Sequence, residues 1–382
     1  MASGLSAALV FFSALGLAAS WPSPSALISR TARVLNFFPI PVSEECIATD
    51  GRRSGTCLNT YDCRIQNGES SGPCALGFGV CCVFAVSCGS MVENNITYLV
   101  NPGFPSLMNG KMECKIKIKK MAPDVTQFRL DFIHFNMGQP NRKTGACDSD
   151  VFKVTGGSSR DINLCGQNSG QHMYFDVENI KDAVTITMNL TQDIYRIWEI
   201  KVSQIEFNSR APAGCNQYYH GTKGVIQTMN YAINGRHLAD QDYSICIRQE
   251  EKMCSIAYEP CDDNSFKIGP PIISNDDNGS GGGPVFGAQG TPLGQGSPSQ
   301  SCSDRVVMPC DTEDFITPVG SAGLCDLLHC GNTFCSSSDG PCRIESSIKP
   351  FNIRVQFGPS AGEENPEDNI GMCLRYEQQA CT

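Results

Sequence analysis

The sequence has little basic charge, and this limits its range of partners. It carries 29 Lys and Arg against 39 Asp and Glu, a net charge of -10. Nucleic-acid binding depends on clustered Lys and Arg, so we expect no nucleic-acid partner. In the one basic run, 111–120, Lys alternates with apolar residues. That alternation predicts a strand with one solvated face.

Histidine is also scarce, and its placement argues against catalysis. No two of the five histidines stand a helical turn apart around a glutamate, as a zinc protease requires. None lies in the sequence context of a serine-protease histidine base. The glycine-rich stretch near residue 280 lacks the lysine of a phosphate-binding loop. We therefore predict that the protein is not an enzyme.

Long apolar runs are missing after the N-terminus. The run from Leu5 to Ala19 is uncharged and ends in small residues, which is typical of a secretory signal, so we predict a signal peptide over 1–20. It is shorter than the ~20 apolar residues that span a bilayer. No later stretch has spanning length, and no C-terminal apolar tail directs a lipid anchor. We expect a secreted, extracellular protein that is not membrane-anchored.

Cysteine is absent from the first 45 residues and abundant afterwards. The total of 22 is even, and no repeated Cys-x-x-Cys with matching histidines suggests zinc. Disulfides in an oxidising compartment are the natural interpretation. Three Asn-x-Ser/Thr sequons predict glycosylation at Asn95, Asn189 and Asn278.

Three segments of different composition follow the signal. Residues 21–45 are rich in proline and predict a loosely structured leader. Residues 46–83 hold six cysteines and few large apolar side chains, so disulfides must stabilise this segment, and the sequence alone allows 15 pairings. From about residue 87, short runs alternate apolar and polar residues, as in 128–132 and 183–188. This pattern predicts an all-β protein built from antiparallel β-sandwiches.

The segment 46–83 resembles the clip domain that precedes serine proteases in extracellular cascades. The motifs that carry the resemblance are Thr56-Cys57, Tyr61-Asp62-Cys63 and Gly79-Val80-Cys81-Cys82. The resemblance implies three disulfides: Cys46 with Cys81, Cys57 with Cys74, and Cys63 with Cys82.

Residues 87–207 resemble a CUB domain, a secreted, jelly-roll-like β-sandwich. The motifs are Asn101-Pro-Gly-Phe-Pro105, Cys114-Lys-Ile-Lys-Ile118, Phe132-Ile-His-Phe135, Cys147-Asp-Ser-Asp-Val-Phe152, Leu164-Cys-Gly166 and the strand from Trp198 to Ile205. The resemblance implies disulfides between Cys88 and Cys114 and between Cys147 and Cys165.

Residues 214–382 resemble a divergent CUB domain, interrupted at 267–300 by a flexible Gly-, Pro- and Ser-rich insertion. The motifs are Tyr218-Tyr-His-Gly221, Gly224-Val-Ile-Gln-Thr-Met-Asn-Tyr231 and Gln241-Asp-Tyr-Ser-Ile-Cys-Ile-Arg248. By analogy, Cys215 pairs with Cys246 and Cys302 with Cys330. Eight further cysteines have no assigned partner: Cys254, Cys261, Cys310, Cys325, Cys335, Cys342, Cys373 and Cys381.

The CUB resemblance raises the question of calcium. Many CUB domains hold this ion with a Glu, two Asp and a Tyr, and use the ordered loops to bind a partner's lysine. Asp150 matches one Asp position, but the Glu position falls near Gly138 and the second Asp position near Asn189 or Asp193. A hard cation needs at least two charged oxygen ligands. We expect no cofactor and keep Asp150 as a candidate metal ligand, the alternative being an Asp that stabilises a turn.

The sequence as a whole predicts a non-catalytic protein that binds an extracellular protein or glycoprotein through its CUB domains. The alternative is a non-catalytic regulator or cofactor of an extracellular serine-protease cascade, because the clip resemblance points to such systems. The fold alone does not decide between them.

Overall fold

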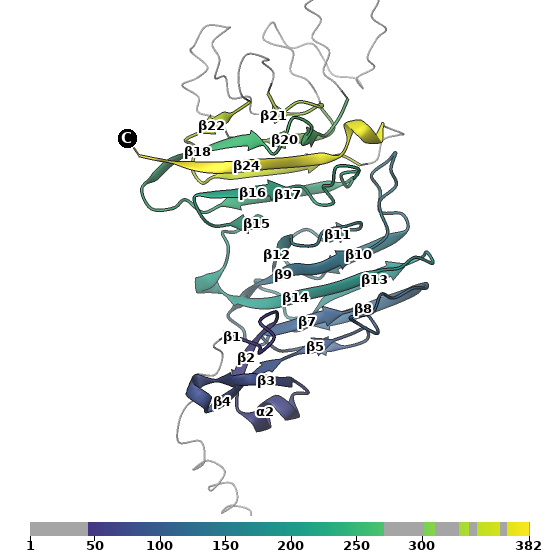
Figure 1. Cartoon of the computed structure of the whole chain (residues 1–382), viewed down its shortest axis with the longest axis vertical. Helices are drawn as coiled ribbons and strands as arrows, with labels where there is room; N and C mark the ends of the chain where they lie inside the picture. Colours follow the sequence, from purple (N-terminus) through teal and green to yellow (C-terminus); the bar gives the residue numbers. More distant parts are fainter. Residues whose placement is uncertain (1–44, 271–301, 310–327, 336–341, 360–364, 382) are drawn as a thin grey trace, which may run out of the picture.

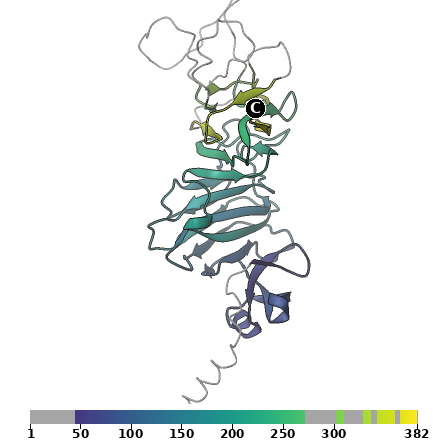
Figure 2. The same cartoon turned by 90° about the vertical axis from the view of Figure 1, so that its left-hand side faces the viewer.

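The computed structural model describes residues 45–270, 302–309, 328–335, 342–359 and 365–381. Three units follow one another along the long axis of the molecule (Figure 1). They are the N-terminal unit (45–84), the first sandwich (85–210) and the second sandwich (215–381). The same order is visible after a quarter turn (Figure 2). Within the described part of the chain, no helix has both the length and the apolar content to cross a membrane.

The N-terminal unit is a small four-stranded sheet with one short helix, held by three disulfides. The sheet has the order β1-β2-β4-β3. Its buried apolar cluster contains little besides Leu58, Phe84 and cysteines, so the disulfides must supply much of its stability. The elements are β1 (Glu45–Ile47), β2 (Ser54–Leu58), α2 (Thr60–Ile65), β3 (Glu69–Cys74), a 3-10 turn (Ala75–Gly77) and β4 (Gly79–Val83).

The first sandwich packs two five-stranded sheets face to face. Their strand orders are β11-β10-β13-β8-β6 and β12-β9-β14-β7-β5. The strands are β5 (Ala85–Val86), β6 (Met91–Val92), β7 (Ile96–Val100), β8 (Met112–Ile118), β9 (Val125–Asn136), β10 (Asp150–Thr155), β11 (Ile162–Leu164), β12 (His172–Asp176), β13 (Val184–Leu190) and β14 (Ile197–Glu206). A 3-10 turn (Phe207–Ser209) ends this unit.

Period-two patterning produces the core of this sandwich. In β8, Cys114, Ile116 and Ile118 are buried while the intervening Glu and Lys side chains are exposed. The predicted solvated lysine face is therefore confirmed. Between the sheets, Phe132 and Phe152 meet edge-to-face with their ring centroids 5.9 Å apart, in contact with a third ring, Phe135.

The second sandwich repeats the two-sheet plan. The sheets have the orders β15-β17-β23-β20-β21 and β16-β24-β18-β22, and β19 also pairs with β24. The elements are β15 (Cys215–Tyr219), β16 (Lys223–Gln227), β17 (Gln241–Ile247), β18 (Met253–Pro260), β19 (Phe266–Lys267), β20 (Arg305–Val307), β21 (Leu328–His329), β22 (Ile344–Ser346), β23 (Asn352–Phe357), a 3-10 turn (Pro366–Asp368) and β24 (Gly371–Ala380).

The disulfides follow the strand pairing. The structure contains all seven pairs that the resemblances imply: Cys46–Cys81, Cys57–Cys74, Cys63–Cys82, Cys88–Cys114, Cys147–Cys165, Cys215–Cys246 and Cys302–Cys330. Three more pairs, which the sequence left unassigned, are Cys254–Cys381, Cys261–Cys373 and Cys335–Cys342. Cys254 in β18 bonds to Cys381, just after β24, and Cys261, just after β18, bonds to Cys373 in β24, so both disulfides join these two paired strands. Cys310 and Cys325 lie outside the described residues.

The predicted all-β fold of antiparallel sandwiches is confirmed, with one addition. Three pairs are parallel: β5 with β7, β6 with β8, and β15 with β17. Each involves a strand at a sheet edge, which has a single neighbour and so can run in either direction. Most of the predicted insertion 267–300, from residue 271 onward, lies outside the described residues, as do the predicted signal and almost all of the leader.

Candidate recognition groove

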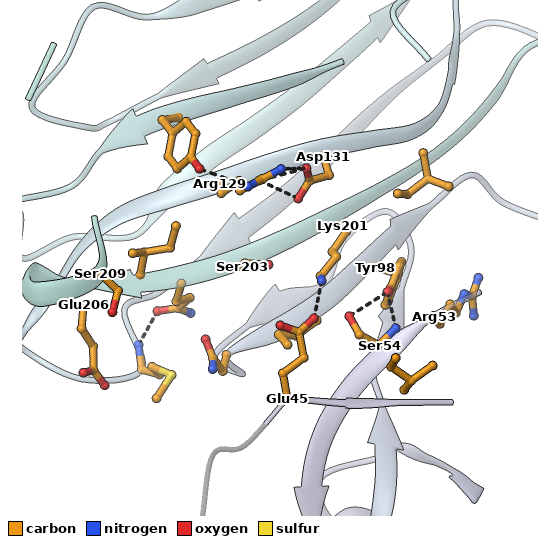
Figure 3. A pocket seen from close by; sticks show the side chains of 18 of the residues that line it. Glu45, Arg53, Ser54, Tyr98, Arg129, Asp131, Lys201, Ser203, Glu206 and Ser209 are labelled. Atoms are coloured by element: carbon orange, nitrogen blue, oxygen red, sulfur yellow. Dashed lines mark hydrogen bonds and ion pairs between the residues drawn. The ribbon is translucent and has the colours of Figure 1, made fainter. Parts of the chain in front are cut away.

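The structure contains an open groove of about 910 Å³ to which all three units contribute. Its floor is the outward face of the β12-β9-β14-β7 sheet of the first sandwich, and β1 and β2 of the N-terminal unit form one wall (Figure 3). His220, just after β15 of the second sandwich, lines it too. We call this depression the groove.

Two rows of side chains cross the floor because neighbouring strands pair in register. One row runs Tyr174–Arg129–Ser203, and the other runs His172–Asp131–Lys201–Tyr98. Residues two apart on a strand share a face, so the two rows lie side by side. The floor is therefore polar, although it covers an apolar core.

The charges of the floor are paired with one another. Arg129 donates through Nε and Nη2 to the Asp131 carboxylate at 2.7–3.0 Å, and its Nη1 donates to the Tyr174 hydroxyl at 3.1 Å. Burial lowers the pKa of Arg129, but the Asp131 carboxylate outweighs this and the pKa is raised overall. Burial raises the pKa of Tyr174, against the opposing effect of Arg129. Arg129 is thus held charged and Tyr174 neutral.

A second set of contacts fixes the N-terminal unit against the first sandwich. Lys201 Nζ lies 2.6 Å from Glu45 Oε1, and the Ser54 amide donates to the Tyr98 hydroxyl at 2.7 Å (Figure 3). Arg53 Nε pairs with Glu199 at 2.7 Å while the guanidinium lies 5.0 Å from the centre of the Tyr98 ring. Beneath them, apolar contacts join both units through Ala48, Val83, Ile96 and Tyr98. The groove wall is therefore anchored by charge, hydrogen bonds and packing.

Glu45 shows the electrostatic effect of this junction. Burial raises the pKa of its carboxyl. The hydrogen bonds from Lys201 and Ser54 and the charge of Lys201 together lower this pKa by more than burial raises it, so the net shift is downward. The carboxylate is consequently ionised at neutral pH. Glu45 and Lys201 therefore form an ion pair between oppositely charged groups where the floor of the groove meets its wall.

Apolar side chains are exposed at the same place. Ile47 on β1 is 74% exposed, Ile133 on β9 is 42% exposed, and Met121 is 40% exposed; all three line the groove. A large apolar side chain that stays in water beside paired charges is a common feature of protein-binding surfaces.

The junction between the two sandwiches lies at the far end of the floor. Nε2 of His172 lies 3.0 Å from the Tyr218 amide nitrogen and 3.1 Å from the Tyr218 carbonyl oxygen, so it accepts from the amide in one neutral tautomer and donates to the carbonyl in the other. Burial and the nearby Arg129 charge lower the pKa of His172 to about 4, so it is neutral at physiological pH. Asn168 and Asn230 bond across the same junction, from Asn230 N to Asn168 Oδ1 at 2.7 Å.

The other predicted site residues lie apart from the groove floor, with one exception. Asn95 lines the groove, beside the start of β7. Asn189 is exposed on β13, in the other sheet of the sandwich, and Asn278 lies outside the described residues. Asp150 is fully buried at the start of β10.

The residues around Asp150 do not fit a calcium site. Its carboxylate forms a salt bridge with Arg196, and the side chains of both are fully buried. Gly138, which has no side chain, occupies the position where the CUB resemblance implies a Glu, and its amide donates to Asp150. Asp193, at the second implied Asp position, is exposed beside Lys111. Within the described ranges, no three His, Cys, Asp or Glu side chains are grouped so as to hold a metal.

His237 is the histidine most deeply enclosed by polar groups, and it is a packed residue. It lies 3.3 Å from Asp304 but is 1% exposed, with its ring against Phe357. Burial and Arg236 lower the pKa of His237 to about 3. A neutral, enclosed imidazole of this kind supports the core rather than a reaction with substrate.

Sequence reasoning did not find the groove. Its wall and floor come from segments about 150 residues apart, as in the Glu45–Lys201 pair. The signal that was present is the sequence of polar residues at alternate positions of 129–131 and 201–203, which marks an outward sheet face but not what lies above it.

Comparison with known proteins identifies the two sandwiches. A CUB domain model matches residues 88–199, and an animal CUB domain model matches residues 212–379. No curated protein matches the chain.

Solved structures of extracellular proteins also match this chain. The CUB1-EGF-CUB2 domains of rat MASP-1 are 12% identical, with 77% of this chain and 99% of that chain covered, at a TM-score of 0.25. The corresponding fragment of human MASP-1/3 is 14% identical, covering 75% and 100%, also at 0.25. The full extracellular region of zebrafish Gpr126/Adgrg6 is 10% identical, covering 78% of this chain and 37% of that one, at 0.27. From the two family matches, the chain belongs to the CUB domain family, with one CUB domain in each sandwich.

Proposed function

We propose that this chain is a secreted, non-catalytic binding protein that recognises an extracellular protein or glycoprotein in the groove. The observation that carries the proposal is the composition of the groove: the N-terminal unit, the first sandwich and the second sandwich all line one depression. CUB domains mediate interactions between extracellular proteins. A surface built jointly by three linked units presents its groups to a partner in a fixed arrangement.

The chemistry of the groove suggests the character of the partner. Arg129 is paired with Asp131 and Lys201 with Glu45, so these four charges cancel within the groove. Their remaining hydrogen-bonding capacity and the exposed Ile47 and Ile133 suit a segment that offers both polar and apolar groups. An extended stretch of protein meets this description better than a polyanion, which would need unpaired cations.

The test is affinity capture of the intact protein's partner from its native extracellular fluid, followed by mapping of the contact. Purified partner should protect β1, β9 and β14 of this chain from hydrogen exchange. Protection confined to other faces of the sandwiches would refute the groove as the binding site while leaving the binding function intact. Failure to retain any extracellular protein would count against the function itself.

The alternative, a regulator or cofactor of an extracellular serine-protease cascade, is favoured by one feature of the N-terminal unit. Its three disulfides have the pairing implied by the clip resemblance. Besides Ile47 in the groove, the same unit leaves four large apolar side chains exposed: Tyr61, Ile65, Leu76 and Phe78. A partner that is a protease or zymogen, and that loses affinity when Ile65 is replaced, would establish this alternative.

We also propose that Asn95 and Asn189 carry N-linked glycans. Asn189 is exposed on a sheet face that does not line the groove, so a glycan there leaves the groove open. A glycan on Asn95 would stand at its edge and restrict which partners enter. Peptide mass mapping before and after enzymatic deglycosylation measures the occupancy of each site. Asn95→Gln should then alter partner affinity more than Asn189→Gln.

A further inference from the structure

One end of the first sandwich contains a fully buried ion pair between Asp150 and Arg196. Asp150 is the first residue of β10, and Arg196 immediately precedes β14. Charges removed from water are tolerated only when they are paired and their remaining hydrogen-bonding groups are satisfied. The surroundings of both side chains meet this condition.

Every N–H of the Arg196 guanidinium has an acceptor. Nε and Nη2 bind the two oxygens of Asp150, the second at 2.8 Å. Nη2 also donates to the Gln192 carbonyl at 2.6 Å, and Nη1 donates to the carbonyls of Ile194 at 2.8 Å and Gly110 at 3.2 Å. These five bonds use all five donors of an arginine side chain.

The Asp150 carboxylate is equally engaged. Besides Arg196, it accepts from the Gly138 amide at 2.8 Å and from the Thr191 amide at 3.4 Å. A Cβ at position 138 would lie 2.9 Å from the carboxylate, so a glycine allows this close approach. The pair thus connects four separate segments, near residues 110, 138, 150 and 191–196.

We infer that the Arg196 guanidinium serves as a built-in cation, which holds together the loops that calcium orders in many CUB domains. A carboxylate and backbone carbonyls are the ligands that calcium takes in proteins, and here they surround a guanidinium. A calcium ion in this place would add two positive charges beside one guanidinium and a single carboxylate. This end of the first sandwich is therefore ordered by the chain itself and does not require metal.

The first test is the thermal unfolding of the intact, oxidised protein in millimolar calcium and in excess EDTA. The melting temperature should differ by less than about 1 °C, and calorimetric titration with calcium should show no site that Asp150→Asn removes. A rise of many degrees with calcium, abolished by Asp150→Asn, would overturn the inference.

The second test compares the buried pair with an exposed pair of the same geometry. Arg354 donates to both oxygens of Asp242 at 2.8 and 2.9 Å on the surface of the second sandwich. Asp150→Asn and Arg196→Gln should each lower the melting temperature by about 8 °C or more, and Asp242→Asn by less than about 2 °C. Equal losses at the two sites would contradict the role of Arg196. If the Asp150 and Arg196 variants are not secreted, the calcium measurement on the unmodified protein still decides.

Discussion

The N-terminal unit and the first sandwich are stabilised in opposite ways. The N-terminal unit joins its strands with three disulfides around a cluster that holds Leu58, Phe84 and two cysteines. The first sandwich has two disulfides and a core that fully buries Phe128, Phe152 and Trp198. Covalent bonds therefore replace apolar burial where a unit is too small to form a core. The groove combines both, because its wall belongs to the unit stabilised by disulfides and its floor belongs to the sandwich stabilised by an apolar core.

Reduction of the disulfides should produce the largest difference in stability between the two units. A disulfide removed from a small domain costs about 2–5 kcal/mol, and the N-terminal unit has three with almost no core behind them. With increasing reductant, residues 45–84 should lose hydrogen-exchange protection first, while β9 and β14 remain protected. Loss of protection in both units at the same reductant concentration would contradict the comparison.

The core of the first sandwich should respond to a cavity. Phe152→Ala removes a ring that meets Phe132 and Phe135, and should lower the free energy of unfolding by about 3–5 kcal/mol. Ile133→Ala, on the facing sheet and 42% exposed, should change it by less than about 1 kcal/mol. Chemical denaturation followed by tryptophan fluorescence measures both. Similar losses would mean that Phe152 is not part of a close-packed core.

Acid should weaken the junction between the sandwiches through His172. Its pKa is about 4 in the folded protein and about 6.5 when unfolded, so the unfolded state binds the extra proton as pH falls. The stability that this residue contributes is complete above pH 6.5 and is lost progressively toward pH 4, by up to about 3 kcal/mol. His172→Gln, which can still accept from the Tyr218 amide, should flatten this part of the pH profile. An unchanged profile would show that other groups carry it.

The smallest effect is expected where the N-terminal unit meets the floor. Tyr98→Phe removes the hydroxyl that accepts from the Ser54 amide and should cost about 1 kcal/mol, observed as faster hydrogen exchange across β1 and β2. The matched control is Tyr61→Phe, whose ring is 72% exposed on the N-terminal unit. Exchange that is unchanged in Tyr98→Phe would mean that the hydroxyl does not secure the wall.

The fold was predictable from the sequence because its signals are local. Alternation in 112–118 predicts a strand with one solvated face, and the spacing of six cysteines resembles a clip domain. The resemblances carry seven disulfide pairs, but Cys254–Cys381 and Cys261–Cys373 span 127 and 112 residues and follow from strand pairing alone. The second sandwich departs from the basic pattern at these positions.

The groove and the buried pair were not predictable, because both join distant residues. Asp150 belongs to a recognisable motif, but its partner Arg196 lies 46 residues away and is part of no motif in the sequence. The same holds for Arg53 and Glu199, which are 146 residues apart and meet where the N-terminal unit rests on the sandwich. Such contacts depend on how whole units pack, and a single sequence does not encode that packing in any short pattern.

The most direct test of the groove is the affinity of the captured partner for two charge-introducing variants and a control. Ile47→Asp and Ile133→Asp place a carboxylate in the groove at exposed positions, where folding should be unaffected. Each should weaken binding by about tenfold or more. Ile65→Asp, at a position that is 56% exposed on the N-terminal unit and does not line the groove, should leave affinity within about twofold of the unmodified protein. The opposite pattern, with Ile65→Asp harmful and the groove variants neutral, would contradict recognition in the groove and favour docking through the N-terminal unit.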